Sequence, residues 1–169
     1  MFRSFYKIAL LLGLALFTTS GWTAVLKANQ GVFISQVRQA INGPKQNQER
    51  INSAALALQQ AFKAHTKHVL YSPSCSSVDC LAGPKIQGYS YYVSPQFVFW
   101  DNQAANGAGQ KDVPELKIAI YDVASRQVIA TQIISSGSSS VMIGGSHTEH
   151  ELLSGSVKAA IDAFYKDPS

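Results

Sequence analysis

The sequence has little charge, only two cysteines and no apolar run of membrane-spanning length. Charged residues make up 14% of its 169 residues, roughly half the share in a typical soluble protein. Hydrophobic residues make up 46% and aromatic residues 10%, a composition that excludes an intrinsically disordered chain. A chain of this length has room for one hydrophobic core and little more. We therefore expect a single folded domain.

The excess of positive charge is too small to indicate a nucleic-acid partner. The formal net charge is +4, but Arg3 and Lys7 lie in a segment that we expect to be removed. Without these two, 12 Lys and Arg residues remain against 10 Asp and Glu residues, a net charge of +2. Surfaces that bind nucleic acids or other polyanions carry a strong cluster of basic residues. We expect no nucleic acid among the partners.

The amino-terminal residues have the three-part layout of a secretory signal. Arg3 and Lys7 precede an apolar run over residues 8–17, and small or hydroxyl residues follow at 18–21. A helix that spans a bilayer needs about 20 apolar residues, so a permanent anchor is the weaker alternative and we expect no stable membrane span. We predict a signal peptide over residues 1–21 and one domain over 22–169. Cleavage as late as residue 24 is the alternative. No cysteine stands at the end of the apolar run to be acylated, which favours soluble periplasm as the destination.

The two cysteines, Cys75 and Cys80, lie close together in a polar stretch. A closely spaced pair in an exported chain favours a structural disulfide. A zinc site needs four ligands, and a redox-active pair usually has two residues between its cysteines. We predict a disulfide, with the redox pair and the metal site as weaker alternatives.

The spacing of apolar residues predicts the order strand, helix, four strands, helix. Apolar residues recur every three or four positions over 48–65 and 149–166, which predicts two amphipathic helices. Short β-branched and aromatic runs predict strands at 31–36, 68–71, 89–100, 116–121 and 128–135. We predict an α/β (α+β) fold with one mixed sheet of about four to five strands and both helices on one face.

Two further features concern the predicted strands and their connections. Pro95 cannot donate to a strand ladder, so we expect its strand at the edge of the sheet or Pro95 at a bulge. Residues 78–87 have room for at most one helical turn around Gly83 and Pro84. Residues 101–113 are polar and rich in Gly and Asn, and so long a connection is typical of a mobile or functional loop.

No motif marks a catalytic centre. The chain has no Gly-x-Ser-x-Gly segment that would single out a nucleophilic serine, and the Ser/Gly run at 135–140 lacks the lysine of a phosphate-binding loop. We therefore expect a protein that is not an enzyme and binds no cofactor.

One cluster of metal-capable side chains surrounds His147 and His150. Its order, His-Thr-Glu-His-Glu, differs from the zinc-protease pattern His-Glu-x-x-His. Thr148 and Glu151 instead have the spacing of a helix capping box. A solvated helix start is the favoured interpretation, and a metal site at His147 and His150 is the weaker one.

Several short motifs carry a family resemblance. They are Tyr91-Tyr-Val-Ser-Pro95, Phe99-Trp-Asp101, Ile118-Ala-Ile-Tyr-Asp122, Ile143-Gly-Gly-Ser-His147 and Leu152-Leu153. The chain resembles an uncharacterised family of small Gram-negative envelope lipoproteins with Tyr-x-Val-x-Pro and Trp-Glu-Asp motifs, over residues 31–166. Two departures are the missing lipidation cysteine and the segment 102–107, which replaces a charged stretch of the family.

The order of the last elements is also similar to the amino-terminal domain of TolB. The outer-membrane activators of penicillin-binding proteins and the curli secretion lipoproteins share this layout, and the resemblance implies contacts with other envelope proteins. This is an analogy of fold, which by itself does not determine function.

These observations lead to one functional hypothesis and its rivals. We predict a non-enzymatic periplasmic protein that binds an envelope protein and acts as a scaffold, assembly factor or regulator. The alternatives are a small-ligand or metal-binding protein, a hydrolase without a recognisable motif, and a homo-oligomer whose strand edges pair between copies. The candidate partner-binding residues are Trp100, Asp101, Asn102, His147, Glu149 and His150.

Overall fold

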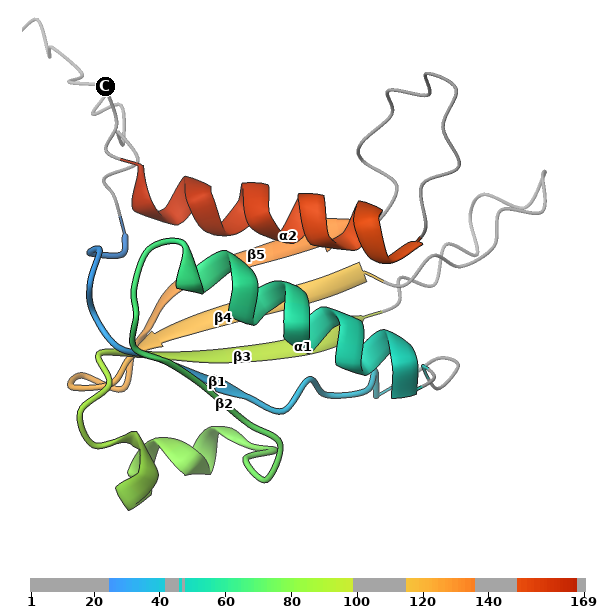
Figure 1. Cartoon of the computed structure of the whole chain (residues 1–169). Helices are drawn as coiled ribbons and strands as arrows, with labels where there is room; N and C mark the ends of the chain where they lie inside the picture. The colour runs from blue at the N-terminus through green and yellow to red at the C-terminus, as the bar shows by residue number, and fades with distance from the viewer. Residues whose placement is uncertain (1–24, 42–45, 47, 99–114, 136–148, 167–169) are drawn as a thin grey trace, which may run out of the picture.

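One mixed five-stranded sheet forms the centre of the molecule (Figure 1). The computed structural model describes residues 25–41, 46, 48–98, 115–135 and 149–166. The strands are β1 (Val32–Ser35), β2 (Val69–Ser72), β3 (Tyr91–Val98), β4 (Glu115–Asp122) and β5 (Val128–Ser135). Their order across the sheet is β2-β1-β3-β4-β5. β1 is parallel to β2 and β3, whereas β3–β4 and β4–β5 are antiparallel. The predicted mixed sheet is confirmed.

Two helices, α1 (Gln48–Lys63) and α2 (Glu149–Tyr165), lie side by side on one face of this sheet (Figure 1). Residues at helical spacing, such as Leu58 on α1 and Ile161 on α2, are fully buried against it. The strands meet them with alternate residues, and Ile118 and Ile120 of β4 are likewise fully buried. Removal of this apolar surface from water is the main source of stability, and the predicted amphipathic helices are confirmed.

The opposite face of the sheet carries a smaller core. Phe33 and Tyr92 are buried there under the short 3₁₀ helices η1 (Val78–Ala82) and η2 (Pro84–Ile86). The expectation of at most one helical turn here was wrong. Gly83 ends η1 with a bond from its N–H to the Cys80 carbonyl, and Pro84 begins η2. A proline at this position favours a new helix start, because its fixed φ suits the first turn and its missing N–H is not needed there.

Pro95 lies on β3, the central strand, so the expectation of an edge strand was wrong. The bulge alternative fits better. Ile34 pairs with Val93, but the next parallel bridge joins Arg38 to Gln96. Four residue steps on the β1 side therefore match three steps on β3, which leaves one extra residue. Pro95, which has no N–H to donate, lies beside this irregular stretch.

No helix among the described residues is long and apolar enough to cross a bilayer. The predicted signal peptide over residues 1–21 lies outside the described part of the chain. Its presence and the boundary of the domain stay predictions.

Candidate functional site

Most of the predicted partner-binding residues lie outside the described residues. This applies to Trp100, Asp101, Asn102 and His147. Glu149 and His150 form the beginning of α2, where only the backbone is described. The structure does show where the segments that carry these residues are attached.

Both segments are attached at one end of the sheet. Segment 99–114 joins the end of β3 to the start of β4, and segment 136–148 follows the end of β5. Val98 pairs with Glu115, and Glu115 pairs with Ser135. The Ser135 hydroxyl also donates a hydrogen bond to the Glu115 carboxylate. We call the row Val98, Glu115 and Ser135 the sheet end, because it holds the attachment points of both segments on neighbouring strands.

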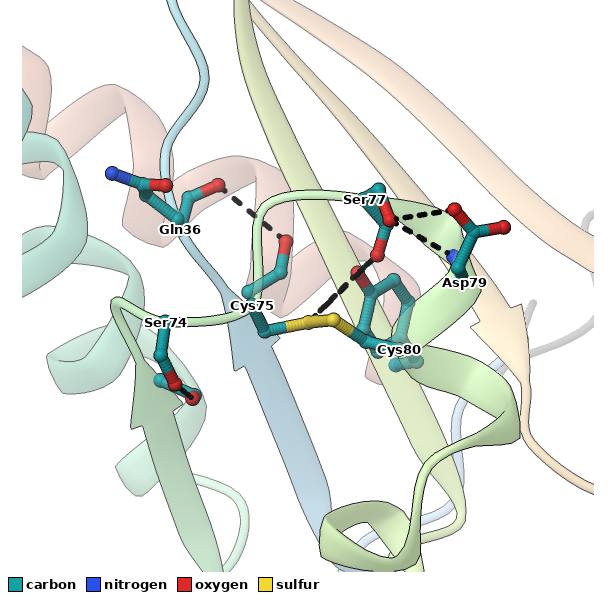
Figure 2. Close-up of a disulfide and its surroundings, with 9 residues drawn as sticks. Gln36, Ser74, Cys75, Ser77, Asp79 and Cys80 are labelled. Carbon is teal, nitrogen blue, oxygen red and sulfur yellow. Dashed lines mark hydrogen bonds between the residues drawn. A yellow bond between two sulfur atoms is a disulfide. The ribbon is translucent and has the colours of Figure 1, made fainter.

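Residues 73–87 form a cap over part of the sheet face opposite the helices, where Phe33 and Tyr92 are buried. Cys75 and Cys80 are joined by a disulfide with their Cα atoms 6.0 Å apart (Figure 2). The Tyr92 hydroxyl donates to the Ser77 carbonyl at 2.8 Å. Burial raises the pKa of Tyr92, so this hydroxyl remains a proton donor at neutral pH. The Tyr92 ring stacks on Phe33 at 5.9 Å, and together these contacts hold the cap to the sheet.

The cap also holds the bulge that follows β1. The Gln36 N–H donates to the Cys75 carbonyl at 2.8 Å (Figure 2). The next residue, Val37, is buried in the core beneath the helices. Arg38 then makes two backbone hydrogen bonds with β3. Its N–H donates to the Pro95 carbonyl, and its carbonyl accepts from the Phe97 N–H. Because the bulge adds one residue, Arg38 faces away from the helices, whereas strict alternation from Ile34 would turn it toward them.

The Arg38 guanidinium has spare hydrogen-bonding capacity. Its Nη2 donates to the Ser94 hydroxyl at 3.2 Å, and Ser94 is itself buried. Its Nε is buried and has no hydrogen-bond partner. Among the residues that the structure describes, the ion pairs present do not involve Arg38. A buried donor without a partner costs free energy. Nε itself is out of reach of another molecule, so a partner could contact only the exposed part of this half-buried side chain.

Arg38 is the first of four paired residues that form a row across the sheet, perpendicular to the strands. The pairing runs from Arg38 to Gln96, from Gln96 to Lys117 and from Lys117 to Ile133. Lys117 is exposed, and Ile133 is 37% exposed. We call the residues that the cap leaves uncovered on this side the open face: Arg38, Gln96, Lys117, Ala119, Thr131 and Ile133.

The open face offers cations, an amide, a hydroxyl and an aliphatic side chain. Such groups recognise carboxylates, carbonyls and apolar side chains, which is the chemistry of a protein-binding surface. Within the described ranges, no group of three or more His, Cys, Asp or Glu side chains is arranged to hold a metal ion. The face adjoins the sheet end, since Lys117 lies two residues after Glu115 on β4.

A second polar cluster joins the carboxyl ends of the two helices. His65 Nε2 and Asp162 Oδ1 are 2.8 Å apart, and Lys158 Nζ donates to Asp162 Oδ2 at 2.5 Å. The hydrogen bonds from Lys158 and His65 lower the pKa of Asp162. His65 also stacks on Tyr165 with ring centroids 4.0 Å apart, and burial raises the pKa of Tyr165. Because these contacts link α1 to α2, we assign them a structural role.

The sequence interpretation missed Arg38 and the bulge. The signal was present in the spacing of apolar residues, since Ile34 and Val37 are three positions apart and both are buried on the same face. An odd spacing of this kind within an extended segment indicates a bulge.

The fold and the cap define an α+β domain with one helix-covered face and one open face. The sequence matches the model of the family described as Domain of unknown function (DUF4823) over residues 24–159, so the chain belongs to that family. The expected membership of an uncharacterised family is confirmed. The Tyr-x-Val-x-Pro and Trp-Glu-Asp motifs of that family and the lipoprotein character of its members stay predictions. No curated protein matches the sequence.

Several solved structures are similar to this chain at low sequence identity. The PelC dodecamer from Paraburkholderia phytofirmans is similar with a TM-score of 0.53 and 14% identity, over 85% of this chain and 92% of that chain. LpoB from E. coli is similar with a TM-score of 0.43 and 13% identity, over 67% of this chain and 59% of that chain. TolB from Acinetobacter baumannii is similar with a TM-score of 0.39 and 14% identity, over 82% of this chain and 28% of that chain. The likeness to PelC concerns the fold alone.

Proposed function

We propose that this chain is a non-enzymatic periplasmic protein that acts through protein–protein contacts, as a scaffold, assembly factor or regulator. The observation that carries the proposal is the open face, on which the Arg38 guanidinium bonds to Ser94 and takes part in none of the ion pairs among the described residues. This face adjoins the sheet end. Both segments with predicted partner-binding residues begin at that end. The partner therefore contacts the open face and these two segments together.

Export is supported by two independent features. The amino-terminal residues have the layout of a secretory signal. The disulfide between Cys75 and Cys80 suits an oxidising compartment. Because the disulfide braces the cap, and the cap carbonyl of Cys75 holds the bulge, the orientation of Arg38 depends on a bond that persists in the periplasm.

The chemistry of the surface indicates what the partner presents. The exposed part of the half-buried Arg38 guanidinium suits a carboxylate, because a carboxylate can accept hydrogen bonds from a charged guanidinium. Ile133 adds apolar area beside it. Trp100 and His147, on the two attached segments, would supply aromatic anchors of the kind that dominate binding energy at interfaces. The partner is thus an envelope protein that presents an acidic side chain flanked by apolar residues.

A second copy of the chain is a further partner in this proposal. The similar PelC fold occurs in a dodecamer, so an assembly of copies is compatible with this architecture. Assembly through β5 and binding of another envelope protein would share Thr131 and Ile133, which lie on β5 and on the open face, whereas Arg38 belongs to the second contact alone.

The test is crosslinking and affinity purification of the mature protein from its native envelope, followed by binding measurements with the purified partner. We expect a specific partner whose affinity falls at least tenfold in a Trp100→Ala, His147→Ala variant and in Arg38→Gln. Leu56→Ala is the matched control, since Leu56 is exposed on α1, away from the open face. Unchanged affinity in all of these variants would refute the assigned surface.

A further inference from the structure

β5 is the last strand at one edge of the sheet formed by the described residues. The inner side of β5 pairs with β4 from Glu115↔Ser135 to Tyr121↔Val128. On its other side no strand pairs with it among the described residues. Its sequence, Val-Ile-Ala-Thr-Gln-Ile-Ile-Ser, contains no charged residue, proline or glycine. Proteins usually protect such an edge with charges, proline, bulges or a covering segment, because its free N–H and C=O groups can pair with another strand.

β5 is better suited to pairing than β2, the strand at the opposite edge. β2 has four residues, whereas β5 has eight. The one irregularity of β5 lies near its start, where the register shifts beside Ile120 and Tyr121. From Ala130 to Ile134 the pairing with β4 is regular, so these residues present an even row of backbone groups at the edge of the sheet.

The chemistry of β5 favours a second copy of the same strand. Two identical strands related by a two-fold axis run antiparallel, and the antiparallel pairing of β3, β4 and β5 would continue across the contact. In such a pair each residue stands opposite one from the same sequence, so a charge near the axis would meet its like. β5 carries no charge that would create this repulsion. Val128 and Ile133, 51% and 37% exposed, would also gain apolar neighbours.

We propose that β5 pairs antiparallel with β5 of a second copy, so that two five-stranded sheets join into one continuous sheet across a two-fold axis. This deepens the proposed function by naming a second copy and the strand it binds. It rests on the backbone edge of β5, whereas the contact with another envelope protein rests on Arg38 and the sheet end. Thr131 and Ile133 lie on both surfaces, so Arg38 is the residue that separates the two contacts.

The test is analytical ultracentrifugation of the purified mature chain over a wide range of concentrations. We expect the mass to rise from monomer to dimer as the concentration increases. In Thr131→Lys, which places a lysine in the middle of β5 and near its symmetry mate, dimerisation should need at least tenfold higher concentration. Leu56→Lys adds the same charge at an exposed position of α1 and should dimerise like the wild type.

Hydrogen exchange supplies a readout that needs no variant. Backbone amides of β5 should become more protected as the concentration rises, while those of β2 should not change. A wild-type chain that stays monomeric at every concentration would overturn the proposal. So would an oligomer to which Thr131→Lys makes no difference. Arg38→Gln should leave the dimer intact, so loss of the envelope partner and loss of the dimer are separate results.

Discussion

The two faces of the same sheet are built from alternate residues of the same strands, yet they differ in burial and in chemistry. On β4, Leu116, Ile118 and Ile120 are at most 1% exposed beneath the helices. Lys117, between two of them, is exposed on the open face. The helix-covered face holds the fold together by apolar burial, and the open face carries polar and charged side chains such as Lys117 and Arg38. In the proposed function, stability and recognition are therefore separated by one residue step along a strand.

The largest effect should come from breaking the helix-covered face. Ile118→Ala removes a fully buried side chain and should cost about 3 kcal/mol in the free energy of unfolding, because a cavity remains. Lys117→Ala, its neighbour on the same strand, should change that free energy by less than about 0.5 kcal/mol. Urea unfolding of both variants measures the difference. Equal losses would contradict the division between the two faces.

The helix-covered face is also the part that the sequence predicts well. The strand at 128–135 was predicted with its observed bounds, and the helices at 48–65 and 149–166 differ from α1 and α2 by one or two residues. Apolar periodicity reports burial directly, and burial decides these elements. The position of β3 in the sheet was misjudged, because Pro95 indicated an edge and the compensating bulge lies on another strand.

The next largest effect concerns the cap. Cys75→Ser with Cys80→Ser removes the disulfide and should lower the free energy of unfolding by about 2 kcal/mol, the chain-entropy value for a short loop. Reduction of the wild type should give a similar loss in urea unfolding. Ser76→Ala, at an exposed position in the same loop, is the control. A reduced protein as stable as the oxidised one would show that the cap does not need its disulfide.

A smaller effect should appear in the acid range. Asp162 has a lower pKa in the folded chain than its ordinary value of 3.8, because Lys158 and His65 bond to its carboxylate. Its contribution to stability is therefore present above about pH 4 and is lost as the pH falls through the folded pKa. Melting temperatures between about pH 5 and pH 2 should fall less steeply in Asp162→Asn than in the wild type. Parallel curves would contradict a stabilising role for this carboxylate.

The smallest effect on stability should come from the open face. Arg38→Gln removes one hydrogen bond to Ser94 but also removes a buried donor without a partner. These two changes oppose each other, so the free energy of unfolding should change by less than about 1 kcal/mol. Chemical denaturation of this variant is the measurement. A loss as large as that of Ile118→Ala would make Arg38 a structural residue and remove the main support for the open face as a binding surface.

Much of the candidate site could not be predicted from the sequence. Trp100 and His147 were selected for their chemistry. The segments that carry them are attached at one end of the sheet only because Val98, Glu115 and Ser135 are in register. Strand register depends on long-range pairing, which local patterns do not report. Arg38 was missed because its orientation depends on one extra residue and on a bond to the Cys75 carbonyl.

The most direct test of the open face as a partner surface is site-specific photo-crosslinking in the native envelope. A photoreactive residue is placed at Lys117, on the open face, or at Leu56, on the outer side of α1. We predict a discrete adduct with one envelope protein from position 117, lost in the Arg38→Gln background, and no such adduct from position 56. The same adduct from both positions, or an adduct from position 56 alone, would contradict the central claim.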